Sequence, residues 1–114
     1  MPNPITHVAF PDDMKYLQDT LYVLNGKWKL LIILSVCSGH SRFRDIQRSI
    51  PGITSRMLSK ELKELEMNKF VARTVYDESP VRVEYTNTSY CKTFSTLIQE
   101  MIAWGKQHHQ TIKS

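Results

Sequence analysis

Residues 49–71 have the sequence SIPGITSRMLSKELKELEMNKFV, in which a turn precedes an amphipathic helix. Pro51-Gly52 interrupts the chain, and Thr54 is a residue type that caps the amino end of a helix. The apolar residues Leu58, Leu62 and Leu65 recur at i, i+4 and i+7, so they share one helix face. The other face carries Arg56, Ser59, Lys60 and Lys63. One face can enter a core while the other meets an anion, as a DNA recognition helix requires.

The flanking segments predict a helix-turn-helix followed by a wing. The expected elements are a short strand at 40–43, a first helix at 44–50, and hairpin strands at 71–76 and 81–86. Val81, Val83 and Tyr85 alternate with polar residues, so we expect one buried face on the second strand. Residues 77–80 form the turn between the strands. Asn68 is expected to end the recognition helix.

Three more helices make the predicted fold α+β, mostly α, a winged helix-turn-helix with extra amino- and carboxy-terminal helices. Residues 11–25 begin with acidic residues that complement a helix amino end, and residues 27–37 are apolar almost all round. Residues 88–113 form a long final helix capped by Thr88. Because a small domain cannot easily bury the apolar stripe of that helix, we expect 11–25 and 88–113 to form a homodimer interface. Its residues would be Leu17, Leu21, Tyr90, Phe94, Leu97, Ile98, Met101 and Trp104. The alternative is a final helix that folds back over its own domain.

The chain has 114 residues, a formal net charge of +4 and an isoelectric point near 9.2. This length predicts one domain over residues 11–114, with a DNA-binding unit at 39–87 and a flexible arm at 1–10. The basic balance favours anionic partners, and we expect double-stranded DNA. The longest apolar run is too short to cross a bilayer, and residues 1–10 lack a secretory signal pattern. We therefore expect a cytoplasmic protein without a membrane partner.

Arg56 is the best candidate for a base contact, because its planar guanidinium can bind guanine at two atoms. Ser55 and Ser59 can meet bases or phosphates, while Lys60 and Lys63 suit phosphates. The complete set of expected DNA contacts is Arg42, Arg44, Arg48, Thr54, Ser55, Arg56, Ser59, Lys60, Lys63 and Arg82. Structural alternatives exist: Lys60 can pair with Glu64 along the helix, and Arg82 can pair with Glu84 or Asp77.

Neither cysteine belongs to a metal-type motif. Cys37 closes an apolar helix and is expected to be buried and inert. Cys91 opens the final helix, whose amino end can lower a thiol pKa, so it is the candidate reactive thiol, although an inert role is favoured. His108 and His109 diverge around a helix and do not suit one metal ion. With no catalytic motif in the sequence, we expect neither an enzyme nor a cofactor.

Several motifs in order resemble one family over residues 17–104. They are Gly26-Lys27-Trp28, Arg42-Phe43, Ile50-Pro51-Gly52-Ile53, the segment from Leu58-Ser59 to Leu65-Glu66, and Pro80 followed by Arg82-Val83-Glu84-Tyr85. The chain thus resembles the HxlR-type winged-helix transcription regulators of the MarR-like superfamily. The resemblance implies a dimeric, cytoplasmic DNA-binding protein, often responsive to a small electrophile or oxidant. Lys15 stands where many members carry a cysteine, so that thiol switch is not carried over. Val81 replaces a proline that the family usually repeats.

Two questions remain open at the level of sequence. A winged helix that only contacts other proteins is the alternative function, with the same cationic face binding an acidic protein surface. An unidentified small-molecule effector is a further expected partner, lodged between the dimer helices and the DNA-binding unit.

Overall fold

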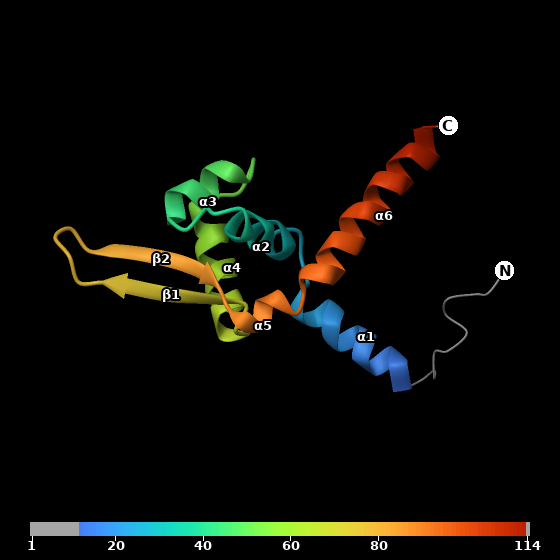
Figure 1. The fold of residues 1–114 in the computed structure, drawn as a ribbon, viewed down its shortest axis with the longest axis horizontal. Helices are drawn as coiled ribbons and strands as arrows, with labels where there is room; N and C mark the ends of the chain where they lie inside the picture. The colour runs from blue at the N-terminus through green and yellow to red at the C-terminus, as the bar shows by residue number, and fades with distance from the viewer. Residues whose placement is uncertain (1–11, 114) are drawn as a thin grey trace.

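The computed structural model describes residues 12–113 and shows a mostly helical α+β fold (Figure 1). Its elements are α1 (Asp12–Val23), α2 (Lys29–Cys37), α3 (Phe43–Ser49), α4 (Ser55–Met67), β1 (Val71–Tyr76), β2 (Arg82–Asn87), α5 (Ser89–Lys92) and α6 (Ser95–Lys113). The order is that of the predicted winged helix-turn-helix. The predicted flexible arm at 1–10 lies outside the described residues.

The hydrophobic core lies between α2, α3, α4 and the base of the hairpin (Figure 1). It consists of Ile32, Ile33, Val36, Ile46, Ile50, Ile53, Leu58, Leu62, Leu65, Phe70, Val71 and Cys91. Trp28 is partly buried and packs against this cluster. The core therefore fixes the two helices of the helix-turn-helix on the central helix α2.

The recognition helix α4 forms where the sequence predicts it. Gly52 adopts a φ of 88°, a left-handed conformation that glycine tolerates, in the turn before α4. The backbone N–H of Met57 donates to Thr54 Oγ1 at 3.1 Å, so Thr54 caps the helix. Asn68 follows its last residue.

The hairpin is antiparallel, with Val71 opposite Asn87 at its base and Tyr76 opposite Arg82 at its tip. The second strand begins one residue later than predicted, and Val81 precedes it with 59% of its surface exposed. The predicted strand at 40–43 is absent from the described structure. Instead α3 already begins at Phe43, and Ser41 makes a single backbone hydrogen bond, accepting from the N–H of Tyr85 at 2.8 Å.

The long final helix predicted at 88–113 is interrupted. Thr88 caps the short α5 by accepting from the N–H of Cys91, but the N–H groups of Thr93 and Phe94 bond three residues back, to Tyr90 and Cys91. Such i→i+3 bonds tighten the turn and end α5. The longer α6 then starts at Ser95.

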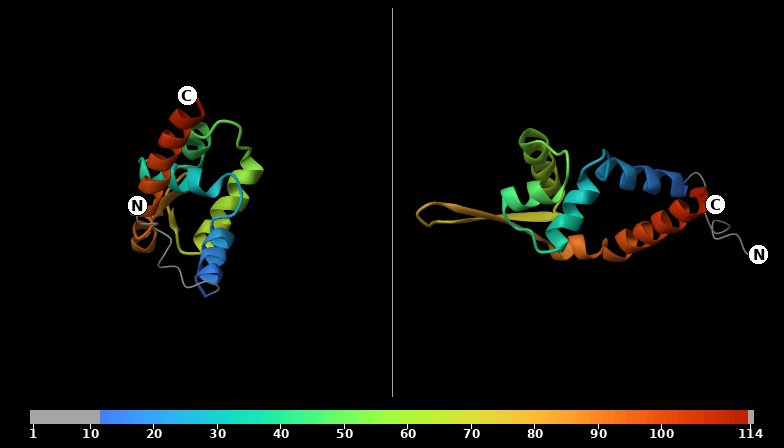
Figure 2. Two further views of the ribbon diagram at one scale, coloured as in Figure 1. Left: turned by 90° about the vertical axis from the view of Figure 1, so that its right-hand side faces the viewer. Right: turned by 90° about the horizontal axis from the view of Figure 1, so that it is seen from above.

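Helices α1 and α6 extend from the core as two arms, on the side away from the hairpin tip (Figure 2). Neither helix has a buried residue. In the described part of the chain, no helix has both the length and the apolar character needed to cross a membrane.

Candidate nucleic-acid interface

The two faces of α4 differ as the sequence predicts. Leu58 and Leu65 are fully buried and Leu62 is 1% exposed. The cationic and hydroxyl residues of the opposite face are all exposed: Ser55, Arg56, Ser59, Lys60 and Lys63. Arg42, Arg44 and Arg48 of the preceding segment are exposed as well. These side chains are available to an external partner.

Gln47 of α3 joins the two helices of the helix-turn-helix. Its Oε1 accepts from the Ser55 hydroxyl at 3.3 Å, and its Nε2 donates to the carbonyl of Ile53 at 3.4 Å. The hydroxyl oxygen of Thr54 is occupied by the cap described above. The amino end of α4, the part of a recognition helix closest to bases, is therefore held by side-chain contacts as well as by the core.

A buried cation anchors α4 from its inner side. Lys29 Nζ donates to a carboxylate oxygen of Glu61 and of Glu64, each at 2.7 Å. Burial lowers the pKa of Lys29, but the bonds to Glu61 and Glu64 outweigh it and raise the pKa overall. The alternative pair between Lys60 and Glu64 is thus not the principal contact of Glu64. Lys60 remains exposed on the outer face.

Two hollows that contain basic side chains lie beside the wing and its sheet. One of about 490 Å³ lies between the start of α3 and the wing, and Arg42, Phe43, Arg44, Asp45, Val81 and Val83 line it. Another of about 340 Å³ lies between α4 and the sheet, and Ser59, Lys63, Glu66, Arg73 and Tyr85 line it. Sequence reasoning did not assign Arg73 and Tyr85 to this surface. Pairing the two predicted hairpin strands could have placed them together, because Arg73 and Tyr85 stand opposite each other in the register.

The guanidinium of Arg82 is not free. It pairs with carboxylates of the wing, which was the alternative to DNA contact. Its Nε and Nη2 donate to the Glu78 carboxylate at 3.2 and 3.0 Å, and its Nη1 donates to Glu84 at 2.9 Å. The guanidinium also lies over the Tyr76 ring, 3.9 Å from the centroid. The expected partner Asp77 is replaced by Glu78, because the turn brings the Glu78 side chain beside Arg82.

The predicted interface residues divide into two groups. Leu17, Leu21, Leu97, Met101 and Trp104 are exposed on the arms. Phe94 and Ile98 are partly buried against the core, and Phe94 and Tyr90 pack on the ring of Phe70 with centroids 5.1 and 5.4 Å away, while Tyr90 keeps 53% of its surface exposed. The second group thus also contributes to the fold of the single chain.

The expectation that Cys37 is buried is wrong, and Cys91 has the more protected environment. Cys37 is exposed at the end of α2, whereas Cys91 is 3% exposed within the core. Burial raises the pKa of the Cys91 thiol, because removing water disfavours the thiolate, and the nearby Cys37 raises it further. Asn87 connects the two residues, donating to Cys37 Sγ at 3.0 Å and accepting from Cys91 Sγ at 3.8 Å. The Cys91 thiol is therefore largely shielded from solvent.

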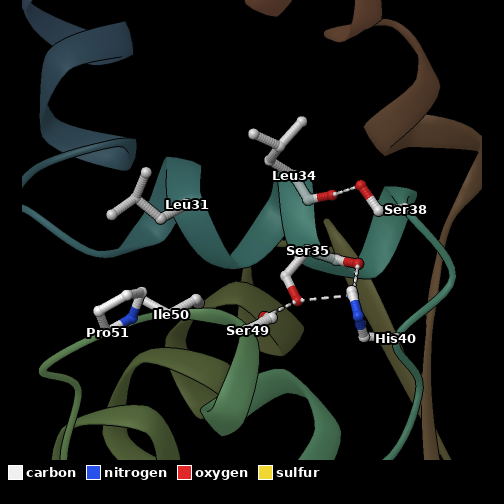
Figure 3. A pocket seen from close by; sticks show the side chains of 8 residues that line it. All are labelled: Leu31, Leu34, Ser35, Ser38, His40, Ser49, Ile50 and Pro51. Atoms are coloured by element: carbon white, nitrogen blue, oxygen red, sulfur yellow. Dashed lines mark hydrogen bonds between the residues drawn. The ribbon is translucent and has the colours of Figure 1, made fainter.

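A hollow of about 230 Å³ separates α2 from the turn before α4 (Figure 3). Leu31, Leu34, Ile50 and Pro51 supply its apolar lining, and Ser35, Ser38, His40 and Ser49 supply its polar lining. His40 Nδ1 lies 3.0 Å from the carbonyl of Ser35, and the Ser35 hydroxyl is hydrogen-bonded to that of Ser49 (Figure 3). In residues 12–113, no three His, Cys, Asp or Glu side chains are grouped to hold a metal ion.

Known proteins with similar sequences and similar structures are transcriptional regulators. The profile of the HxlR-like helix-turn-helix family matches residues 23–113. The HTH-type transcriptional regulator YodB of Bacillus subtilis (strain 168) is 40% identical over 91 residues, covering 80% of this chain and 81% of that protein. The reduced form of the redox regulator HypR has a TM-score of 0.80 at 35% identity, covering 86% of this chain and 97% of that one. A structure assigned to the MarR family of transcriptional regulators, from Enterococcus faecalis V583, has a TM-score of 0.78 at 30% identity, covering 95% and 98%.

Proposed function

The chain belongs to the HxlR-like helix-turn-helix family and is a DNA-binding transcriptional regulator rather than an enzyme, and from this premise we propose that it binds a palindromic operator as a homodimer. The observation that carries the proposal is the exposed cationic face of α4, whose inner face is anchored in the core. The expected setting is the cytoplasm.

In this proposal α4 lies in the major groove with its amino end nearest the base edges. Arg56 contacts a base, and the hydroxyls of Ser55 and Ser59 contact bases or phosphates. Lys60 and Lys63 bind phosphates, which position the protein without specifying sequence. The hollow lined by Arg42 and Arg44 is suited to the phosphates next to the groove, and the wing meets the backbone or the adjacent minor groove. Arg48 and the backbone around Thr54 complete the contact.

The homodimer is supported by the arms. Apolar side chains of α1 and α6 are exposed together: Tyr16, Leu17, Leu21, Tyr22, Leu97, Met101, Ile102 and Trp104. Leu31 and Leu34 on α2 continue this surface, with 43% and 42% of their area exposed. Leu31, Leu34 and Met101 line one hollow between α2 and α6, and an exposed apolar surface of this kind is typical of a protein interface. Two copies related by a two-fold axis would place two recognition helices on successive turns of DNA.

A small-molecule effector is part of the proposal. The hollow lined by Leu31, Leu34, Ser35, His40 and Ser49 lies between the arm surface and the turn that leads into α4. It combines an apolar lining with hydrogen-bonding groups, as ligand sites do. A molecule bound there would alter the position of α4 relative to the arms. HypR is described as a redox regulator, but by the family resemblance Lys15 stands at the position of a cysteine that a thiol switch would need.

Selection of bound sequences from a random duplex pool, at near-physiological salt, tests the proposed function. The expected result is an enriched palindrome with half-sites about one helical turn apart. Its affinity should exceed that for random duplex by at least ~1000-fold. A folded dimer that enriches no sequence would contradict operator binding and favour the protein-contact alternative. Repeating the selection with candidate effectors then separates a missing ligand from a missing activity.

A further inference from the structure

The wing tip holds its arginine in a set of internal contacts. Three of the five N–H donors of the Arg82 guanidinium are used, two by the Glu78 carboxylate and one by Glu84. The aromatic ring of Tyr76 covers one face of the guanidinium, with the centroid 3.9 Å from its central carbon. The hydrogen bond from Arg82 lowers the pKa of Glu78, so this carboxylate is charged at neutral pH.

The wing tip itself carries more negative than positive charge, and the cation Arg42 before α3 also acts on Glu78. Residues 76–84 contain Asp77, Glu78 and Glu84 against the single cation Arg82. The wing tip is therefore acidic, while the exposed face of α4 is cationic. A tip of this sign is repelled by the phosphate backbone unless its arginine is released to meet a phosphate.

A phosphate that binds Arg82 has to replace a carboxylate as its partner. The new contact is of the same charge-assisted kind as the one it replaces, so the exchange yields little net attraction. The displaced carboxylate would then stay close to the backbone as an unpaired negative charge. Both effects reduce the DNA affinity contributed by the wing.

We infer that Glu78 and Glu84 limit the affinity of this protein for DNA by pairing with Arg82 at the wing tip. This inference rests on the proposed function, because it concerns the duplex that the wing meets. Glu78 makes the larger contribution, since it binds two donors of the guanidinium and its side chain is 52% exposed. The pairs sit near the surface and contribute little to folding, so their removal leaves the hairpin intact.

The test is a double-variant cycle with Glu78→Gln and Arg82→Ala, measured on the selected operator by fluorescence anisotropy over a salt series. Glu78→Gln should bind the operator several-fold more tightly than the unaltered protein. Its plot of log K against log salt should steepen by about 0.9, the value for one added phosphate contact on duplex DNA. Arg82→Ala alone should weaken binding modestly, because it leaves Glu78 and Glu84 without their arginine, and Glu78→Gln combined with Arg82→Ala should bind no more tightly than the unaltered protein.

Glu100→Gln on α6 is the matched control, because it removes the same charge from an exposed position on the arm. Circular dichroism and thermal midpoints verify that every variant is folded. Weaker binding by Glu78→Gln would overturn the inference, because the carboxylate would then hold Arg82 ready for DNA. A double variant that keeps the whole gain would also overturn it, since only the removal of charge would then matter. An unaltered protein that binds no duplex would contradict the proposed function, and the inference with it.

Discussion

Lys29 is a buried cation that joins the start of α2 to the recognition helix. Its side chain is 5% exposed, and the Glu61 side chain that it contacts is 12% exposed. Asn25 Oδ1 accepts a further hydrogen bond from Lys29 Nζ at 3.2 Å. Because water reaches this site poorly, each charge depends on its protein partners. Lys29 is thus a structural residue in a chain whose other cations are mostly exposed.

Replacing Lys29 with methionine should destabilise the protein. The side chain keeps its length but leaves the Glu61 carboxylate buried without a cation, which costs about 3 kcal/mol in comparable buried pairs. Urea unfolding followed by circular dichroism measures the loss. Lys106→Met, at an exposed position on α6, is the control and should be near neutral. Equal unfolding midpoints for the two variants would show that Lys29 does not anchor α4.

The stabilisation from Glu64 should depend on pH. The hydrogen bond from Lys29 lowers the pKa of Glu64 from its ordinary value of 4.5. The unfolded chain therefore takes up a proton at higher pH than the folded one, so the contribution is complete above about 4.5 and is lost as pH falls through the folded pKa. Glu64→Gln should accordingly be less stable than the unaltered protein at neutral pH, and the difference should shrink in acid.

The measurement for Glu64 is the free energy of unfolding in urea at a series of pH values from about 6 to 3. Glu66→Gln is the control, since Glu66 makes no ion pair within residues 12–113. A stability difference for Glu64→Gln that stays constant into acid would argue against the pairing with Lys29.

At the scale of elements, α4 was predictable because its determinants are local. The leucine periodicity, the Thr54 cap and the Pro51-Gly52 turn all lie within one short segment, and each favours the same helix. The hairpin strands were likewise evident from their β-prone residues. Local agreement of this kind needs no knowledge of the rest of the fold.

The structure differs from the sequence-based predictions at places where residues far apart in the chain contact one another. The final helix is broken beside Phe94, which packs on Phe70 from before the hairpin. Cys91 is buried because the base of the hairpin and α2 cover it, and Cys37 is exposed because it lies at the outer end of α2. The pairing of Arg82 with Glu78 depends on the shape of the turn. None of these contacts has a periodic signature in the sequence.

Arg56→Ala should weaken operator binding by about 1–3 kcal/mol and relax the preference at one base-pair position, because the side chain is expected to contact a guanine edge. Arg48→Ala is the comparison, since removing a phosphate-binding side chain should weaken binding to all sequences alike. Anisotropy titrations against a set of operators with single base-pair changes give both profiles. An Arg56→Ala profile parallel to that of the unaltered protein would remove Arg56 from base recognition.

At the scale of the whole molecule, the chain is more extended than its length requires. Its Cα radius of gyration is 17.0 Å, against about 13 Å for a globular domain of this size. The larger radius of gyration is due to α1 and α6, which extend from the core without a buried residue of their own (Figure 2). A second subunit is the partner that would bury the apolar side chains of both arms and bring two recognition helices together.

A charge placed in the arm surface should therefore separate the subunits. Met101→Glu puts a carboxylate in the apolar stripe of α6, where burial in a dimer would cost several kcal/mol unless the side chain finds a cation. Gln99→Glu adds the same charge on the other side of the helix and should leave the dimer intact. Sedimentation velocity distinguishes the two species directly. If both variants sediment as dimers, Met101 does not lie in the dimer interface.

The same pair of variants links assembly to DNA binding. In a dimer the second recognition helix meets its half-site at a high effective concentration, so the loss of that link should weaken operator binding by about 100-fold or more. Met101→Glu should then bind a full operator no more tightly than a single half-site, whereas Gln99→Glu should still prefer the full operator. The recognition helix of Met101→Glu is unchanged, so its half-site affinity should equal that of the unaltered protein. A monomeric variant that kept full operator affinity would show that each subunit binds on its own, and the arms would then need a different partner.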